Sequence, residues 1–338
     1  MRKPDFEQIQ LVLNNEKPSR PTLFEFYMNE DLYNRFAGYK LPKGADILSE
    51  SKWIIDAYEN AGYDYATIKI SRLFYFPKEY IRHGDTISLN EGSVINDEKS
   101  LSEYIWPDAR MMDFGYMEEL DKYIPKGMKA IIPCAGPQET LISLMGFDNL
   151  CYMFYENPGF IEAVMEGIGK RLMGLYERIL EYPVVGSAIL SDDWGHKTQT
   201  MFSPDIMRKL IIPWHKKIVG LIHESGRPAI LHSCGNIKEV MPDVINIGYD
   251  AKHSFEDEIQ KVEDAYLEYG ENIAILGGID VDFLCREPNE SIKRRCYDML
   301  DLSAERGGYA LGSGNSLPQY VEYEKVIAMI SAANLQLS

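Results

Sequence analysis

The chain has 338 residues, 52 of them acidic and 35 basic, and its formal net charge is −17 at pH 7. This balance argues against nucleic acid and anionic membranes as partners, because both are bound by clusters of Lys and Arg. Five scattered cysteines are typical of a reducing cytoplasm. The chain starts without the apolar core of a signal peptide, and no apolar stretch approaches the roughly 20 residues that span a bilayer. We therefore expect a cytoplasmic protein.

Short apolar segments alternate with helical patterns along the chain. Eight of these segments predict buried strands, at residues 21–26, 65–70, 128–133, 185–190, 228–231, 249–253, 273–278 and 309–314. No Gly-x-Gly-x-x-Gly fingerprint follows the first strand, which disfavours a dinucleotide-binding sheet. The alternation predicts an α/β fold, a (β/α)₈ TIM barrel that residues 1–338 form as a single domain.

Local signals place helices and one insertion around these strands. Residues 5–20 predict an N-terminal helical segment, and residues 48–61 an amphipathic helix that Gly62 stops. Asn157-Pro158 is typical of a helix start, with a capping side chain followed by proline at the first helical position. Residues 73–98 alternate apolar side chains with turn signals, so we predict a hairpin inserted after the second strand.

Polar side chains gather where the predicted strands end. They are Glu25, Lys69, Cys134, Asp192, Asp193, His232, Cys234, His253, Asp280, Ser313 and Asn315. The carboxyl ends of all barrel strands meet at one mouth, and functional residues lie there. We expect some of these side chains only to cap helices or hold loops, and Asp192 or Asp193 is a candidate for that role.

His232 and Cys234 are the strongest metal candidates. They stand two residues apart at the end of the fifth predicted strand, so an extended backbone puts both side chains on one face. An imidazole and a thiolate on one face suit zinc. Two ligands do not complete a site, and other strand ends must supply the rest.

Several motifs carry a resemblance to a known family. They are Gly136-Pro137-Gln138-Glu139-Thr140-Leu141, Ser191-Asp192-Asp193-Trp194-Gly195 with Ser203-Pro204 downstream, Leu231-His232-Ser233-Cys234-Gly235-Asn236, Gly277-Gly278-Ile279-Asp280 and Leu311-Gly312-Ser313-Gly314. In this order, over nearly the whole chain, they resemble the uroporphyrinogen decarboxylase superfamily. The resemblance implies a (β/α)₈ barrel, in agreement with the strand pattern.

The two main branches of that superfamily imply different reactions. The decarboxylases open with an arginine-rich segment and place an aspartate after the second strand, whereas this chain has Tyr27-Met28-Asn29-Glu30 and Ile70-Ser71-Arg72. An acidic mouth would also repel a substrate with many carboxylates. The His-x-Cys pair resembles instead the cobalamin-dependent methyltransferases, which serve methanol, methylamines, methyl halides and methoxylated aromatics.

The resemblance implies zinc, bound by His232, Cys234 and a cysteine after the eighth strand, and a corrinoid (cobalamin) on a partner protein. This chain departs from the pattern, because Asn315 stands where that cysteine is expected. The candidates for the missing ligand are Cys134, Glu25, Asp193 and His253, and we favour Glu25 or Asp193 because zinc accepts oxygen donors. A metal-free vestige is the alternative.

The sequence thus predicts a methyltransferase that moves a methyl group between a small methylated substrate and a corrinoid protein, with zinc as Lewis acid. Asp193 or His253 is the expected catalytic acid. Tyr27, Asp280, Ser313 and Asn315 are the expected substrate-binding residues at the mouth. The alternatives are a decarboxylase for a different carboxylic acid and an inactive binding homologue, and a homodimer is left open beside the monomer.

Overall fold

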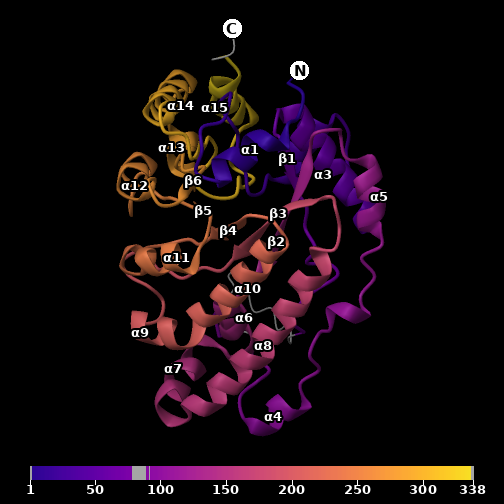
Figure 1. Cartoon of the computed structure of the whole chain (residues 1–338), viewed down its shortest axis with the longest axis vertical. Coiled ribbons are helices and arrows are strands. Elements are labelled where there is room, and N and C mark those ends of the chain that lie inside the picture. The colour runs from indigo at the N-terminus through magenta and orange to yellow at the C-terminus, as the bar shows by residue number, and fades with distance from the viewer. Residues whose placement is uncertain (1, 78–88, 91, 336–338) are drawn as a thin grey trace.

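Seven parallel strands form the centre of the protein. The computed structural model describes residues 2–77, 89, 90 and 92–335. The strands are β1 (Tyr65–Thr67), β2 (Lys129–Ala135), β3 (Val185–Ser191), β4 (Ala229–His232), β5 (Ala251–His253), β6 (Ala274–Leu276) and β7 (Tyr309–Ala310). They pair in chain order from β1 to β7, and helices lie around the curled sheet (Figure 1). This order and the all-parallel pairing confirm seven of the eight predicted strands and the barrel-like α/β class.

Helices connect the strands, as the alternating pattern predicts. The α-helices are α1 (Phe6–Leu13), α2 (Glu30–Ala37), α3 (Ile47–Ala61), α4 (Glu98–Glu103), α5 (Tyr116–Tyr123), α6 (Pro137–Met145), α7 (Phe147–Glu156), α8 (Pro158–Ile179), α9 (Pro204–Ile206), α10 (Ile212–Glu224), α11 (Met241–Ile247), α12 (Val262–Tyr269), α13 (Val281–Arg286), α14 (Asn289–Ser303) and α15 (Tyr323–Leu335). Shorter turns are η1 (Ala109–Met111), the π-helical η2 (Met207–Ile211) and η3 (Lys238–Val240). One cluster of buried apolar side chains extends from Ile9 to Ala333, so sheet and helices share a core. Of the described helices, none is long and apolar enough to cross a membrane.

The expected helix starts follow from their capping residues. The side chain of Asn157 accepts a hydrogen bond from the backbone N–H of Phe160, and Pro158 occupies the first position of α8. Gly62 ends α3 in the left-handed conformation with φ of 91°, which glycine adopts without steric cost. These local signals therefore decide where the helices begin and end.

The prediction of a first strand at residues 21–26 is wrong. In the structure it is no regular strand, and only an isolated parallel bridge joins Leu23 to Leu311. On its other side, the hydroxyl of Tyr65 accepts a hydrogen bond from the N–H of Glu25 (2.6 Å) and donates one to its carbonyl oxygen (2.8 Å). The buried backbone is thus satisfied by a side chain where a strand neighbour was expected. The segment takes the eighth position, between β7 and β1, without regular pairing to β1.

The predicted hairpin at 73–98 is not confirmed. Residues 78–88 and 91 of that stretch lie outside the described residues. Its described remainder contains no strand, and the backbone N–H groups of Val94 and Ile95 bond the carbonyl oxygen of Leu144 in α6.

Candidate functional site

The register of the sheet aligns the ends of three central strands. Ser191 of β3 lies beside His232 of β4, and His232 lies beside His253 of β5. Since the strands are parallel, the loops that follow them leave the sheet at the same edge. Asp193, Cys234 and Ser254, just past these ends, are therefore brought together by register alone.

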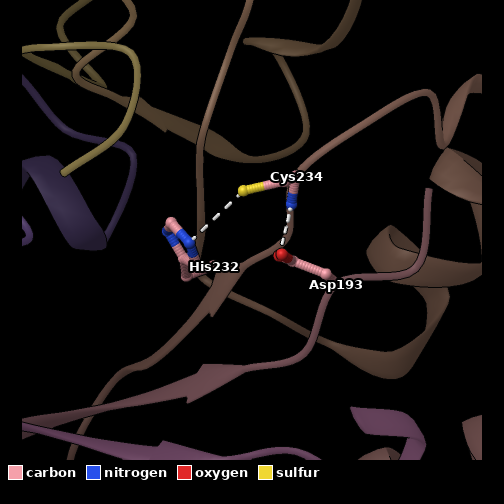
Figure 2. Close-up of side chains that lie close together, drawn as sticks. All are labelled: Asp193, His232 and Cys234. Carbon is pink, nitrogen blue, oxygen red and sulfur yellow. Dashed lines mark hydrogen bonds between the residues drawn. The ribbon is translucent and has the colours of Figure 1, made fainter. Parts of the chain in front are cut away.

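Asp193, His232 and Cys234 form a group that could hold a metal ion. One ligand atom of each lies within 4.8 Å of the others, and we call these three residues the metal group. The thiol Sγ of Cys234 is 3.6 Å from His232 Nε2, and the carboxylate of Asp193 accepts a hydrogen bond from the N–H of Cys234 (2.8 Å), as Figure 2 shows. Sulfur, imidazole nitrogen and carboxylate oxygen are the donors that zinc takes, and three protein ligands leave a position for substrate. The residues present therefore fit zinc.

Two glycines hold the β3 and β4 loops against each other. A side-chain carbon on Gly195 would lie 2.5 Å from the backbone nitrogen of Asn236, and Gly235 has φ of 76° and meets the backbone of Gly195. The N–H of Gly195 donates to the carbonyl oxygen of Cys234 (3.2 Å). Only glycine permits this backbone contact. The glycines of both family-like motifs thereby set the distance between Asp193 and Cys234.

Asp192, the neighbour of Asp193, has a structural role. Its buried carboxylate accepts hydrogen bonds from the backbone N–H groups of Gln138 (3.0 Å) and Glu139 (2.7 Å), at the start of α6, and from the indole N–H of Trp194 (3.0 Å). His215 of α10 is 2.8 Å away on the remaining side. Four partners saturate the group, so of the two aspartates it is Asp192 that holds the loop and Asp193 that faces the metal group.

His253 orients His232 rather than facing the mouth. It is fully buried, and its Nε2 lies 3.2 Å from the carbonyl oxygen of Ser313, which can only accept a hydrogen bond. Nε2 therefore carries the proton, and Nδ1 of a neutral ring accepts from His232 Nδ1, 2.8 Å away. The Nε2 lone pair of His232 is left free toward the metal group.

The protonation of the two rings agrees with this chain of hydrogen bonds. Burial lowers the pKa of His253 to about 3 and holds the pKa of His232 well below its ordinary value. Both rings are therefore neutral near pH 7. Since both nitrogens of His253 are engaged inside the protein, the structure offers it a positioning role in place of the predicted catalytic acid.

The sulfur of Cys234 lies among hydrogen-bond donors. Asn315 Nδ2 is 3.2 Å from Sγ and the Ser254 hydroxyl is 3.4 Å away. Ser254 holds φ at 85°, an unusual conformation for a residue other than glycine, and such strain is often found at functional sites. Burial and the charge of Asp193 raise the pKa of the thiol to about 12, a shift that a bound cation opposes. Asn315, which replaces the expected cysteine, thus contacts the first cysteine.

The remaining predicted residues lie elsewhere at the mouth. Glu25 is fully buried, and its carboxylate accepts from the hydroxyl (2.6 Å) and backbone N–H (3.3 Å) of Ser313. Burial raises the pKa of Glu25 to about 8. Of the two favoured oxygen ligands, the described structure therefore brings Asp193, and not Glu25, to His232 and Cys234. Asp280 caps α13 by accepting from the N–H of Phe283 (2.9 Å), and the ring of Tyr27 lies 4.3 Å from Lys69 Nζ.

Sequence reasoning overlooked three residues near the group: Lys252, Ser254 and Glu139. Lys252 is a buried side chain inside β5, and burial lowers its pKa to about 8 although the nearby acidic groups, Asp193 among them, oppose that shift. A lysine within an apolar strand was a visible signal, because lysine is almost never fully buried without a partner. Nothing in the sequence indicates the backbone conformation of Ser254.

Comparison with known proteins identifies the family. The model of the family described as "Uroporphyrinogen decarboxylase (URO-D)" matches residues 114–335, more than half of the chain. The chain belongs to the uroporphyrinogen decarboxylase family. Its matched region includes β2 to β7 and all three residues of the metal group. No curated protein matches the chain.

One solved structure agrees with this assignment of fold. A methyltransferase from Methanosarcina mazei superposes with a TM-score of 0.72 at 14% identity, and the match covers 98% of each chain. This likeness shows that the uroporphyrinogen decarboxylase family member and the methyltransferase share a fold. The IolI protein, solved with a bound zinc atom, matches with a TM-score of 0.30 at 11% identity, over 83% of this chain and 88% of its own.

Proposed function

We propose that this protein is a methyltransferase that moves a methyl group from a small methylated donor to a corrinoid carried by a partner protein. The observation that carries the proposal is the group of Asp193, His232 and Cys234 at the ends of β3 and β4. Its three donor types fit a catalytic zinc with one position left for substrate. The fold shared with a protein described as a methyltransferase supports methyl transfer as the type of reaction.

The chemistry follows from what this group can hold. Zinc, when bound there, supplies a Lewis acid that polarises the oxygen, nitrogen or sulfur bearing the methyl group. The bond between methyl carbon and heteroatom breaks, the heteroatom keeps the electron pair and takes a proton from water, and the methyl group joins cobalt(I), which supplies the new electron pair. His232 provides a neutral nitrogen in the orientation that His253 sets, and the hydrogen bonds from Asn315 and Ser254 stabilise the thiolate of Cys234. We assign Asp193 to metal binding in place of the acid role expected from sequence.

The test is methyl transfer to free cob(I)alamin, followed by its absorbance spectrum, with methanol, trimethylamine and 2-methoxyphenol as donors. Zinc content is measured in the same preparation. The wild type should bind about one zinc per chain and methylate cobalamin with at least one donor, and His232→Ala should lose both properties. His223→Ala is the matched control, because His223 is exposed and pairs with Asp250 away from the group. Undiminished transfer by His232→Ala would overturn the proposal.

A decarboxylase acting on a smaller carboxylic acid is the second candidate. The family description and Lys69 favour it: Lys69 is a largely buried cation after β1, its pKa is lowered by burial, and a substrate carboxylate could pair with it. Release of CO₂ from carboxylated substrates without any corrinoid, and its loss in Lys69→Met, would support this candidate over methyl transfer.

A further inference from the structure

Ser254 holds a backbone conformation that its residue type does not favour. Its φ is 85°, and among the described residues Asn15 is the only other residue besides glycine with a positive φ. Asparagine enters the left-handed region readily, because its short amide side chain bonds the local backbone, whereas serine seldom does. A left-handed serine persists only where the surrounding structure holds it there. The turn that follows β5 is therefore held by contacts from outside the turn.

The conformation of Ser254 joins three loops at the mouth. Its hydroxyl is 3.4 Å from Sγ of Cys234, in the loop after β4. The next backbone N–H, that of Phe255, donates to the carbonyl oxygen of Gly314 (3.0 Å), one residue before Asn315. Gly314 lies so close that a side-chain carbon there would be 2.2 Å from the carbonyl oxygen of Phe255. A change in the Ser254 backbone would therefore move a hydroxyl away from the sulfur and disturb the loop that carries Asn315.

Lys252 lies on the opposite face of β5 from His232. The neighbour of Lys252, His253, faces His232 with 2.8 Å between the two Nδ1 atoms, and successive side chains of a strand point to opposite faces. Lys252 is only 3% exposed, and it lines a small cavity together with Met241 of α11 and Tyr269 of α12. Any positional effect of Lys252 on the metal group therefore passes through the turn that follows β5.

The ammonium group of Lys252 binds this turn directly. It donates a hydrogen bond to the carbonyl oxygen of Ser254, and Nζ lies 3.9 Å from the centre of the Phe255 ring. The first contact fixes the oxygen of the peptide group between Ser254 and Phe255, and the second fixes the side chain that follows it. A hydrogen bond from a charged donor is roughly twice as strong as a neutral one. Burial of a cation is costly, and the contacts that offset this cost are those that fix the turn.

We propose that Lys252 is a positioning residue, whose ammonium group holds the turn in its left-handed conformation and thereby keeps the Ser254 hydroxyl on the sulfur of Cys234. The proposal rests on the proposed function only in taking Cys234 as a metal ligand. It does not depend on methyl transfer, and the position of the hydroxyl can be observed in metal-free protein. Without the ammonium group the carbonyl oxygen of Ser254 is left buried without its donor, so the peptide group should rotate and take the hydroxyl with it.

The first test is the crystal structure of metal-free Lys252→Met beside that of the metal-free wild type. Methionine puts an apolar group of similar length among Met241, Phe255 and Ile259, and replacing a buried charge in this way is often neutral or stabilising, so we expect the variant to fold. Its residue 254 should leave the left-handed region, with the hydroxyl beyond hydrogen-bonding distance of Cys234 Sγ. A φ of Ser254 that stays near 85° in the variant would overturn the proposal.

The second test is the absorption spectrum of the protein with cobalt(II) in place of zinc. The band in which charge moves from sulfur to cobalt shifts to longer wavelength when a hydrogen bond to the sulfur is lost, because that bond lowers the energy of the sulfur lone pair. Lys252→Met and Ser254→Ala should shift the band equally, and the double variant should show this shift once, since both changes remove the same contact. Zinc affinity should fall roughly three- to tenfold in all three variants. Additive shifts, or an unshifted band in Lys252→Met, would overturn the proposal.

Two further variants separate position from charge. Lys252→Gln keeps a neutral donor, so its band should shift less than that of Lys252→Met, and a larger shift would contradict the role of the hydrogen bond. Lys238 lines the same small cavity but is exposed. Lys238→Met removes the same charge and leaves the Ser254 turn intact, so band and zinc affinity should stay at wild-type values. An equal shift in Lys238→Met would assign the effect to charge and overturn the positioning role.

The outcomes separate this proposal from the proposed function. If the Ser254 turn and the cobalt band change in Lys252→Met but the wild type does not methylate cobalamin, Lys252 positions the sulfur and methyl transfer fails. If cobalamin is methylated while Lys252→Met keeps the turn and the band, methyl transfer stands and the positioning role fails. If the wild type binds neither zinc nor cobalt, the metal-free crystal structures alone decide whether Lys252 holds the turn.

Discussion

Two polar clusters at the mouth each contain a carboxyl group and differ in how their polar atoms are satisfied. Around Glu25, the hydroxyl and N–H of Ser313 and the N–H of Phe26 all donate to one carboxylate, so the protein completes the cluster by itself. In the group of Asp193, His232 and Cys234, lone pairs converge on one place. The first arrangement stabilises a fold, whereas the second needs a proton or a cation between its members. The difference teaches that a buried glutamate at a strand end is weaker evidence for a metal than converging acceptors.

Removing one of the three proposed metal ligands should have the largest effect on zinc affinity. We expect His232→Ala or Cys234→Ala to lower zinc affinity at least 1,000-fold, because two remaining protein ligands hold zinc poorly. Competition with a chromogenic chelator measures the affinity. Glu25→Gln, the matched change in the other cluster, should keep wild-type affinity. Loss of zinc in Glu25→Gln would show that the Glu25 cluster, too, takes part in metal binding.

Loss of His253, the histidine that orients His232, should have the second largest effect on zinc affinity. His253→Phe keeps a ring in the buried space but removes the acceptor for the His232 N–H, so zinc affinity should fall roughly 10- to 100-fold. Cobalt(II) substitution provides a second measurement, because its visible spectrum changes when the ligand ring rotates. His253→Gln, which can still accept a hydrogen bond, should recover part of the affinity. An unchanged cobalt spectrum in His253→Phe would show that His232 needs no orientation.

Loss of the Asn315 amide, which contacts the thiolate of Cys234, should lower zinc affinity less. Asn315→Ala removes one hydrogen bond to Cys234 Sγ, and one such bond to a charged group contributes roughly 1.5–3 kcal/mol. Since sulfur is a weak hydrogen-bond acceptor, we expect a loss at the lower end of this range, about tenfold in zinc affinity, and an upward shift in the pH at which zinc is half bound. Asn236→Ala is the control on the neighbouring loop, since its amide donates to the carbonyl oxygen of Thr198 and accepts from the N–H of Lys238, both outside the group of Asp193, His232 and Cys234. Equal pH profiles for the two variants would remove Asn315 from the site.

The Glu25 cluster should affect stability without affecting zinc. Burial raises the pKa of Glu25 from about 4.5 to about 8, so the folded state binds this proton more tightly than the unfolded state does. The stabilisation is complete below about pH 4.5 and is lost as pH rises toward 8, by at most about 1.4 kcal/mol per pH unit. Urea unfolding at several pH values should show this slope in the wild type relative to Glu25→Gln. Parallel stability curves would show that Glu25 is ionised in the folded state throughout this range.

The sequence predicts correctly those features that depend on the local pattern of apolar and polar residues. Apolar runs predicted seven strands, and the His-x-Cys pair lies where strand alternation places it. The segment at 21–26 was mistaken because its pattern is that of a strand, while its partner on one side is the hydroxyl of Tyr65, which no periodicity reveals. Asp193 and Asp192 could not be told apart, since their roles depend on the start of α6, more than fifty residues earlier in the chain.

The contact between Gly195 and Gly235 has a consequence for how such a protein diversifies. Because the two loops touch through backbone, the distance between Asp193 and Cys234 is independent of the side chains that line the mouth. The cavity that Asp193 lines takes its aromatic wall from residues 74–76, which belong to neither loop. Substitutions there can therefore change which molecule is accepted while the ligand geometry stays fixed. A single rigid centre can in this way be inherited by descendants that act on different compounds.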